Sequence, residues 1–290
     1  MEQTAQEKWN DATREGSLDS QTVSFPPTLY YLFGDYTVEI VSVADGYERI
    51  FWNYVNRDPI DYYFFILDWT QRREQTKIFL AVEGEEVVGS LLVFADYNVQ
   101  FRGSREAVQK LLEHANLEKV ELQAPPDCED IVCQKYKPRI KQDMVLMRLN
   151  RGEEHVCLTE TPVRLDVEDA EEVAVLMRRC DPEWWGEAKA ENLRKSLEKT
   201  FALGIKKDGR LVSAGYTRFV NFASNINMVA TDERYRSRGY ATSIVSALVE
   251  EILKRSPIAL IHVIADNAPA VRAYSKVGFK SYKTYLSIRS

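Results

Sequence analysis

The chain has 290 residues, of which 45% are hydrophobic and 28% charged, and its formal net charge is −6. This length accommodates about two domains, each with its own core. The mild negative charge, with Lys and Arg scattered among Asp and Glu, argues against nucleic acid or an anionic membrane as a partner. The longest apolar run, residues 62–67, is far shorter than a membrane span, and the charged N-terminus lacks the apolar segment of a secretory signal. We therefore expect a cytoplasmic protein.

The cysteines and histidines are spread along the chain without the spacing of a zinc site. Cys128 and Cys133 are close enough in sequence for a bridge or a shared metal, but cytoplasmic thiols are usually isolated. We expect free thiols and no metal. The residues concerned are Cys128, Cys133, Cys157, Cys180, His114, His155 and His262.

The first half of the chain predicts an α/β unit. Residues 1–25 lack periodicity and are interpreted as an appended N-terminal extension. Residues 77–94 predict a β-hairpin with a tight turn at Gly84, and a strand, a helix and a strand follow over residues 98–125. The aromatic run at residues 62–69 is interpreted as core of this unit rather than as a ligand site.

The second half repeats the same order. A hairpin turns at Asp208 and Gly209, and residues 226–265 then predict a strand, a helix and a strand. The repetition indicates a duplicated unit. We place the boundary between an N-terminal domain at residues 26–152 and a C-terminal domain at 153–290, because an apolar strand ends before it and a strand and a helix capped by Asp166 begin after it.

The two halves differ between the third strand and the helix. The first half runs directly into its helix, whereas the second inserts the loop "TDERYRSRGYA". The first N–H groups of a helix have no helical partner and attract anions. Arg236 and Arg238 add cations, Gly239 permits close backbone approach, and Ala241 and Thr242 are small. The loop indicates a phosphate site; the alternative is a solvated Arg-rich turn with glycine as an ordinary N-cap.

Two spaced patterns in this half make the interpretation more specific. The first includes Val229, Thr231, Tyr235, Arg236, Arg238, Gly239, Tyr240 and Ala241, and the second Ala265, Asn267, Ala270, Tyr274, Gly278 and Phe279. In this order they resemble the GCN5-related N-acetyltransferase (GNAT) superfamily, most closely its FR47-like and glycine N-acyltransferase-like branch. The first pattern is similar to the loop that binds the pyrophosphate of acetyl-CoA, and the second to the helix that follows.

The resemblance covers residues 160–290 well and the first half loosely. It implies an α/β fold of tandem GNAT-like lobes, each with a mixed central sheet flanked by helices, of which the degenerate N-terminal lobe lacks the loop. That lobe either helps to form the acceptor pocket or serves as scaffold. The coenzyme's pantetheine arm would pair with strand backbone like an extra strand, where two strands part. The implied acetyl-CoA-binding residues are Met228, Val229, Ala230, Thr231, Arg236, Ser237, Arg238, Gly239, Tyr240, Ala241, Thr242, Asn267, Ala270 and Tyr274.

The resemblance also suggests the catalytic groups. Tyr274 is the candidate acid for the leaving thiolate, and the alternative is a buried structural tyrosine. Many relatives carry a glutamate on the strand before the loop, but "NFASNINMVAT" has no carboxylate. Glu183 and Glu187 are the candidate bases, with ordinary surface acids as the alternative. A water held by Asn225 or Asn227 is a further possibility.

Trp184 and Trp185 adjoin these acids in the sequence. They suit either an apolar or aromatic acceptor or the packing of a helix end.

These observations predict an N-acyltransferase that moves the acetyl group of acetyl-CoA to an amine by direct attack in a ternary complex. The two motifs contain no cysteine, so nothing supports an acyl-enzyme. A small-molecule amine or amino acid is the expected acceptor, and the protein is expected to be a monomer or a homodimer. The alternatives are acetylation of protein or peptide amines, and a sensor or scaffold that binds acyl-CoA without chemistry.

Overall fold

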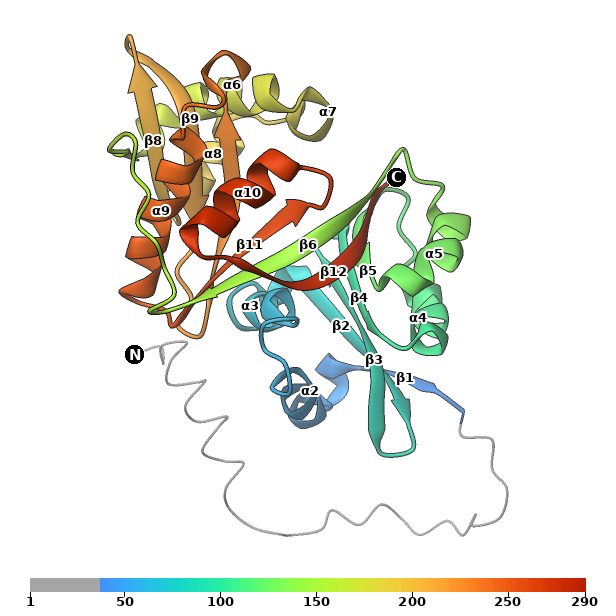
Figure 1. Ribbon diagram of the computed structural model, residues 1–290. Coiled ribbons are helices and arrows are strands. Elements are labelled where there is room, and N and C mark those ends of the chain that lie inside the picture. The colour runs from blue at the N-terminus through green and yellow to red at the C-terminus, as the bar shows by residue number, and fades with distance from the viewer. Residues whose placement is uncertain (1–36) are drawn as a thin grey trace. The chain divides into compact units, whose positions relative to one another are not determined.

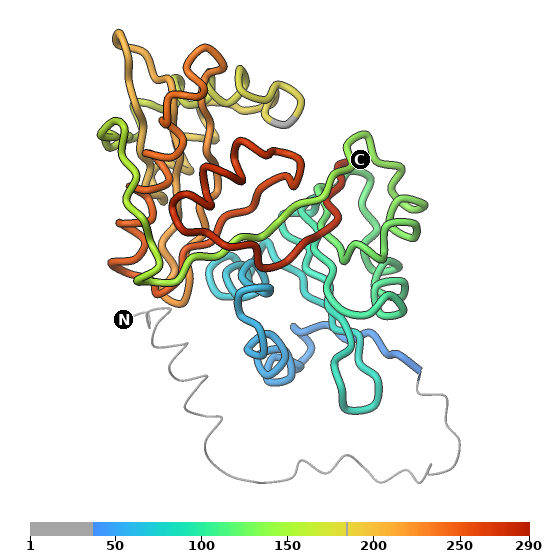
Figure 2. The backbone as a smooth tube through the Cα atoms, in the orientation of Figure 1, coloured from blue at the N-terminus to red at the C-terminus, as the bar shows by residue number. Residues whose placement is uncertain are grey.

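The computed structural model describes residues 37–290, apart from the side chain of Trp184. The expected extension at residues 1–25 lies outside this part. The chain forms two compact units, shown in Figure 1 and, as a backbone tube, in Figure 2. The first unit runs to Gln142 and also includes Tyr285–Ser290, and the second is Asp143–Thr284. The division thus falls inside a strand, and the end of the chain returns to the first unit.

The first unit contains a six-stranded mixed sheet in the order β1-β2-β3-β4-β5-β12, to which β12 (Lys280–Arg289) contributes its end. Neighbouring strands are antiparallel, except that β4 and β5 are parallel. The predicted hairpin is confirmed as β2 and β3. The elements are β1 (Glu39–Ser42), α2 (Glu48–Val55), α3 (Tyr63–Gln71), β2 (Thr76–Glu83), β3 (Glu86–Phe94), β4 (Asn98–Gly103), α4 (Arg105–Leu111), β5 (Glu121–Ala124) and α5 (Glu129–Tyr136), with short 3-10 turns at Val43–Asp45, Arg73–Gln75, Leu112–His114 and Pro126–Cys128.

The second unit has a sheet with the same plan, in the order β7-β8-β9-β10-β11-β6. Again only the fourth and fifth strands, β10 and β11, are parallel among the paired neighbours. The elements are β6 (Ile140–Asn150), β7 (Val163–Leu165), α6 (Ala170–Cys180), α7 (Pro182–Trp185), α8 (Ala190–Leu197), β8 (Phe201–Lys207), β9 (Arg210–Thr217), β10 (Ser224–Thr231), α9 (Tyr240–Leu253), β11 (Ile258–Ile264), α10 (Ala268–Val277) and β12 (Lys280–Arg289), with 3-10 turns at Val167–Asp169 and Glu233–Tyr235.

The shared strand order confirms the predicted duplication, but the last strand of each repeat is exchanged. β6 follows α5 in the chain, yet from Met144 onward it pairs with β11 in the second unit. β12 follows α10, and its end pairs with β5 in the first unit. Each sheet is therefore completed by the strand that follows the other unit's last helix.

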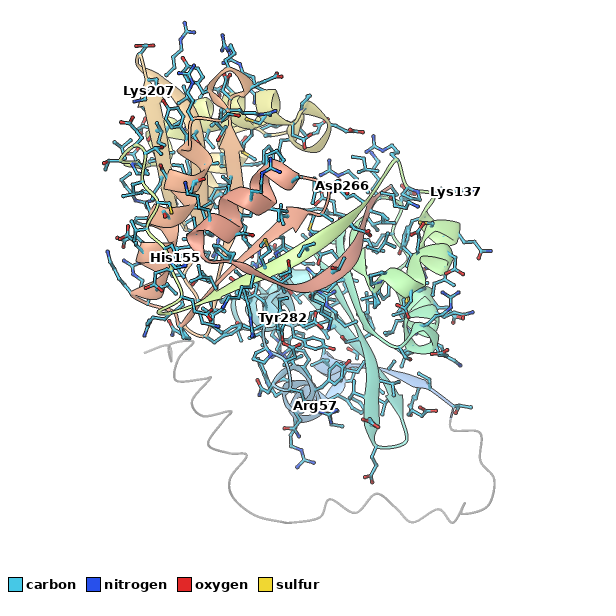
Figure 3. The ribbon with its side chains drawn as sticks, viewed as in Figure 1. Arg57, Lys137, His155, Lys207, Asp266 and Tyr282 are labelled. Carbon is cyan, nitrogen blue, oxygen red and sulfur yellow. The ribbon has the colours of Figure 1, made fainter. Side chains whose placement is uncertain are left out.

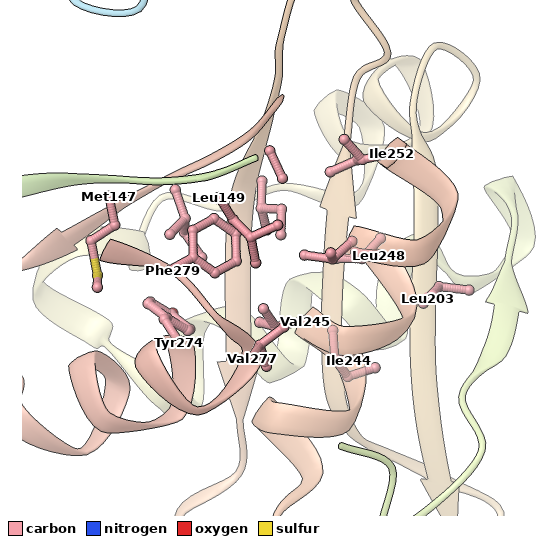
Figure 4. Packing of buried hydrophobic residues seen from close by; sticks show 14 of the residues in the cluster. Met147, Leu149, Leu203, Ile244, Val245, Leu248, Ile252, Tyr274, Val277 and Phe279 are labelled. Carbon is pink, nitrogen blue, oxygen red and sulfur yellow. The ribbon is translucent and has the colours of Figure 1, made fainter. Parts of the chain in front are cut away.

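The sheet of the second unit is covered on both faces. On one face α9 and α10 pack over the sheet (Figure 4). The apolar stripe of α9 is buried there, and it consists of Ile244, Val245, Leu248, Val249, Ile252 and Leu253. On the other face α6 and α8 pack against Met228, Ala230 and neighbouring residues. Removing a buried leucine such as Leu248 from such a core typically costs 2–5 kcal/mol. β10 therefore lies between two packed layers.

The first unit holds a buried ion pair. Arg102 Nε donates to Asp61 Oδ1 at 2.5 Å, and the Tyr285 hydroxyl donates to the same oxygen at 2.6 Å. Both charged side chains are about 97% enclosed. Buried charges are stable only when they are paired and hydrogen-bonded. Because the Tyr285 hydroxyl is one of the partners of Asp61, it links the C-terminal strand to the core of the unit. The aromatic run at residues 62–69 lies mostly in α3 and is largely buried, as predicted.

None of the described helices is both long and apolar enough to cross a bilayer.

Candidate functional site

The β10 strand loses one of its two neighbours halfway along its length. It pairs with β11 only from Ser224 to Ile226. Its register with β9 skips Asn227, which marks a β-bulge, and β10 then continues against β9 from Met228 to Thr231. A bulge bends the strand that carries it. Among the described residues β10 and β11 thus part directly after the bulge, as the resemblance implied.

The hydrogen-bond register shows which backbone groups face the opening. Asp232 N donates to Val212 O at 2.9 Å, so this pair is of the hydrogen-bonded type. Pairs in an antiparallel ladder alternate, so Met228 and Ala230 also bond to β9. The N–H and C=O groups of Val229 and Thr231 consequently point to the side that β11 has left. An extended ligand can pair with backbone on this side whatever the side chains are.

The loop after β10 leads into an open helix N-terminus. Gly239 is the N-cap of α9 and has a left-handed φ of +80°, and no side chain caps this end. Ser243 N is the first amide with a helical acceptor, Gly239 O, so the N–H groups of Tyr240, Ala241 and Thr242 have none within the helix. In the first unit, by contrast, the Ser104 hydroxyl accepts from Ala107 N and caps α4. Within residues 37–290, only the second unit presents such a free helix end beside a loop of arginines.

Two of the three loop arginines lack a carboxylate partner among the described residues. Arg236 donates at 3.4 Å to the carbonyls of Thr231 and Cys180. Arg238 lies 5.1 Å from the centre of the Tyr235 ring. Arg234 is instead paired with Asp232 at 3.2 Å, and this pairing holds the pKa of the Asp232 carboxyl below its usual range. Arg236, Ser237 and Arg238 are exposed, so the two guanidinium charges are available to an anion.

The segment that precedes β7 supports the loop. Thr159 Oγ1 donates to Arg238 O at 3.1 Å, and Thr159 N donates to Ser243 Oγ at 2.8 Å. One turn along α9, Ser246 Oγ accepts from Cys157 N at 2.8 Å. Ser243 and Ser246 are fully enclosed polar residues within an apolar helix. The two serines stand out in the apolar sequence of this helix, but the sequence does not show that the segment at Cys157 and Thr159 bonds to them.

The second motif places its residues in different roles. Asn267 is exposed and caps α10, where its Oδ1 accepts from Ala270 N at 3.2 Å. Tyr274 is 6% exposed and packs beside Phe279, with ring centroids 6.4 Å apart (Figure 4). Burial raises the pKa of Tyr274 to about 12. Its hydroxyl has no hydrogen-bond partner among the described residues, yet it is not among the fully enclosed polar atoms. It therefore retains some access to solvent.

The proposed carboxylate bases lie in and just after the short helix between α6 and α8. Glu183 is in the one-turn helix α7 and Glu187 follows it, and both are exposed. Trp185 is half-buried against the core formed by α6 and α8. This contact corresponds to the alternative in which the tryptophan packs a helix end.

The four cysteines are free thiols. Burial raises the pKa of Cys180, which lies near Arg236, to about 11. A thiol with this pKa is a poor nucleophile at neutral pH. The described residues include no cluster of His, Cys, Asp or Glu that could hold a metal ion.

Residues 202–288, which include the parted strand, the loop and α10, match the family model described as FR47-like protein. A Drosophila protein of known structure superposes with a TM-score of 0.66 at 14% identity, over 88% of this chain and 99% of that one. An acetyltransferase from the GNAT family from Colwellia psychrerythraea gives 0.52 at 12% identity, over 87% and 99%. A GCN5-related N-acetyltransferase from Sphaerobacter thermophilus gives 0.50 at 15%, over 78% and 85%. At these identities the likeness concerns the fold. No curated protein matches the chain.

Proposed function

From the premise that the chain has the GNAT fold with an FR47-like domain at residues 202–288, we propose that it is an N-acyltransferase that moves the acetyl group of acetyl-CoA to an amine. One observation carries the proposal. The open edge of β10 runs into the uncapped N-terminus of α9, so a site for an extended amide chain continues into a site for an anion. Acetyl-CoA has this sequence of parts, a pantetheine arm followed by a diphosphate.

The diphosphate would be bound by backbone and by cations. The N–H groups of Tyr240, Ala241 and Thr242 point out of the helix end, and Arg236 and Arg238 adjoin them. Hydrogen bonds to charged groups contribute about 1.5–3 kcal/mol each. Arg236 would exchange its two 3.4 Å bonds to carbonyls for shorter bonds to phosphate oxygens.

The amides of the pantetheine arm would pair with Val229 and Thr231. The side chains of Met228 and Ala230 are buried on the α6/α8 face, so the strand offers backbone rather than side chains. A backbone N–H at the parted edge can also stabilise the thioester oxygen as negative charge develops on it. The bulge at Asn227 therefore serves binding and chemistry together.

Tyr274 would assist the leaving group. At neutral pH its hydroxyl stays protonated, because its pKa is about 12. An ordinary thiol has a pKa of ~8.5, so a thiolate does not remove this proton completely at equilibrium. The supported role is hydrogen-bond donation to the thiolate, with the final proton relayed from the attacking amine. Attack is direct, since no reactive thiol adjoins the site.

The acceptor class proposed is a small primary amine or an amino acid, with a protein amine as the alternative. A second candidate function is a coenzyme-binding protein without catalysis. The absence of any carboxylate on β10 favours that candidate, because an alkylammonium acceptor with a pKa of ~10.4 needs a base before it can attack.

The test is calorimetric titration with acetyl-CoA, followed on the same sample by detection of released coenzyme A. Glycine, lysine, spermidine and phenethylamine serve as acceptors. Chromatography should replace thiol dyes, because the protein's own four thiols would react. Binding with amine-dependent release supports the transferase. Binding without release from any of these amines or from a lysine-containing peptide would favour the non-catalytic candidate, and failure to bind would refute both.

A further inference from the structure

The fork is the point where β10 leaves β11, directly after the last pair, Ile226 with Ile261. β11 does not end there. It stays paired with β6 through Val263 and Ile264 and stops shortly before Asp266 (Figure 3). The opening therefore exists because β10 turns away from β11, so the residues that produce it belong to β10.

The bulge at Asn227 reverses the face of the sheet that the side chains of β10 occupy. Ile226 packs in the core beneath α9 and α10, whereas Met228 packs against α6 and α8. In a regular strand, residues two apart share a face. The inserted residue accounts for the reversal, and a bulge bends its strand at the same point. The bulge thus separates the half of β10 that is paired with β11 from the half that is open.

Two asparagine side chains, one before the bulge and one in it, bond to each other and to the backbone. Asn225 Nδ2 donates to Asn227 Oδ1 at 2.9 Å, and Asn227 Nδ2 donates to the backbone oxygen of Asn225 at 3.3 Å. Asn225 Nδ2 also donates at 3.2 Å to the backbone oxygen of Ile226, the last paired residue. The side chains of Asn225 and Asn227, called the asparagine clamp below, therefore hold the chain at the bulge.

Asn225 is also anchored to both neighbouring strands. Thr217 Oγ1, on β9, donates to the backbone oxygen of Asn225 at 2.8 Å. On the other side, Asn225 Oδ1 lies 3.2 Å from His262 Nδ1, on β11. Asn225 is 3% exposed, whereas Asn227 is exposed. Buried polar groups with satisfied partners make a structure rigid, so Asn225 is the fixed half of the asparagine clamp.

We propose that Asn225 is a positioning residue for the coenzyme. Together with Asn227 it fixes the bulge, and the bulge directs the backbone N–H and C=O groups of Val229 and Thr231 to the pantetheine arm of acetyl-CoA. The inference rests on the proposed binding of acetyl-CoA and names the side chains that shape the arm's part of the site. Asn225 acts through the backbone that it holds, without contact to the coenzyme.

The physical reason is preorganisation. A strand edge that already has its bound shape loses less conformational freedom when a ligand pairs with it. Without the asparagine clamp the open half of β10 fluctuates around that shape, and ordering it offsets part of the binding free energy of the arm. The diphosphate is affected far less, because its site is the N-terminus of α9 and the loop that Thr159 supports.

The experiment measures by calorimetry the Kd of acetyl-CoA and the Kd of 3′-phospho-ADP, which is the coenzyme without its pantetheine arm. Wild type should bind acetyl-CoA more tightly, because only this ligand reaches the fork. In Asn225→Leu the Kd for acetyl-CoA should rise about tenfold, the equivalent of one buried hydrogen bond, while that for 3′-phospho-ADP should change less than about twofold. Arg236→Gln should instead weaken the binding of both ligands.

Ser224→Ala is the matched control. Ser224 is fully enclosed in the paired half of β10, where its hydroxyl bonds to Ser256 Oγ at 2.6 Å and to the backbone oxygen of Val220 at 3.1 Å. This variant removes buried hydrogen bonds from the same strand but leaves the asparagine clamp in place. Both Kd values should therefore stay within about twofold of wild type, even where the protein unfolds more easily.

Asn227→Ala breaks the asparagine clamp from its exposed side, so it carries the test if Asn225→Leu does not fold. Its binding of acetyl-CoA should weaken in the same selective way. In the double variant the loss of binding free energy should be smaller than the sum of the two single losses, because both substitutions remove the bond between the two side chains.

Equal losses for both ligands, an unchanged Kd for acetyl-CoA, or additive losses in the double variant would each overturn the positioning role while leaving coenzyme binding intact. Wild type that binds 3′-phospho-ADP as tightly as acetyl-CoA would also overturn it, since the arm then has no site at the fork. Failure of wild type to bind acetyl-CoA would refute the proposed function together with this inference.

Discussion

Thr159 occupies the space that a side chain on residue 239 would need. A Cβ placed on Gly239 would lie 2.7 Å from Thr159 Cγ2 and 2.8 Å from its Oγ1. The same hydroxyl donates to Arg238 O, so the arginine loop is held from outside the helix that it precedes. Glycine at this position therefore meets two demands, a left-handed φ and close packing against a second segment.

Gly239→Ala should destabilise the protein more than Gly209→Ala. The φ angle is +80° at Gly239 and +71° at Gly209. An alanine in this left-handed conformation lowers the stability of the folded state by about 1–2 kcal/mol at either position. At residue 239 the new methyl group also clashes with Thr159, and overpacking of this kind costs about 1–3 kcal/mol. At residue 209 no such clash arises, because nothing lies within 4 Å of a Cβ there. Urea unfolding measures the difference, and equal losses would contradict the packing role. Thr159→Gly should recover most of the extra loss.

Arg236→Gln and Arg238→Gln should each weaken acetyl-CoA binding about 10- to 100-fold, the equivalent of one charge-assisted hydrogen bond. Arg234→Gln is the control, because Arg234 is already paired with Asp232. It should leave the affinity within about threefold. Calorimetric titration gives the three constants. If Arg234→Gln weakens binding as much as the other two, general charge rather than a defined site is responsible.

Much of the fold was predictable because its signals are local. The hairpins turn at Gly84 and Gly209 as predicted, and the helix predicted between two strands in residues 226–265 is α9. The exchange of β6 and β12 was not predictable, since each strand would pair equally well by pattern with its own repeat. The links from Thr159 to α9 and from His262 to Asn225 depend on strand and loop placement over 37 or more residues, which periodicity does not encode.

Tyr274→Phe should lower kcat about 10²-fold and leave the Kd for acetyl-CoA nearly unchanged, because the ring keeps its packing and only the hydroxyl is lost. Steady-state release of coenzyme A and calorimetry measure the two quantities. Val277→Ala, a buried position in the same helix, is the control for loss of packing alone. An unaltered turnover in Tyr274→Phe would remove the hydroxyl from the mechanism.

Alkaline pH should destabilise wild type more than Tyr274→Phe. Burial raises the pKa of Tyr274 to about 12, whereas an unfolded tyrosine has a pKa of ~10. The raised value favours the neutral form in the folded state, so the contribution of Tyr274 is complete below pH 10 and is lost as pH rises to 12. The loss is on the order of 2–3 kcal/mol. The free energy of unfolding is measured at pH 9, 10.5 and 11.5 for both proteins. The difference between them isolates the contribution of Tyr274, because both contain the same other tyrosines. A difference that does not change with pH would contradict the prediction.

Tyr285→Phe should cost about 1–3 kcal/mol, because it removes a buried hydrogen bond to the ionised Asp61. Arg102→Leu should cost more, about 3–5 kcal/mol, since it removes the buried guanidinium that pairs with Asp61. The double variant Arg102→Leu with Asp61→Asn should be more stable than Arg102→Leu alone. Thermal and urea unfolding test the order. If Arg102→Leu is no worse than Tyr285→Phe, the ion pair does not govern the stability of the first unit.

The return of Tyr285–Ser290 to the first unit imposes an order on biosynthesis. The first unit has nearly all its residues once Gln142 has been synthesised, yet the end of its last strand and the tyrosine that bonds Asp61 appear only after the whole second unit has been made. At 5–20 residues per second the nascent chain waits roughly 7–30 s with the outer edge of β5 unpaired. An unpaired strand edge invites pairing with other chains. Early termination a few residues before Ser290, or a C-terminal fusion that holds these residues back, would therefore leave the half of the protein made first unfinished.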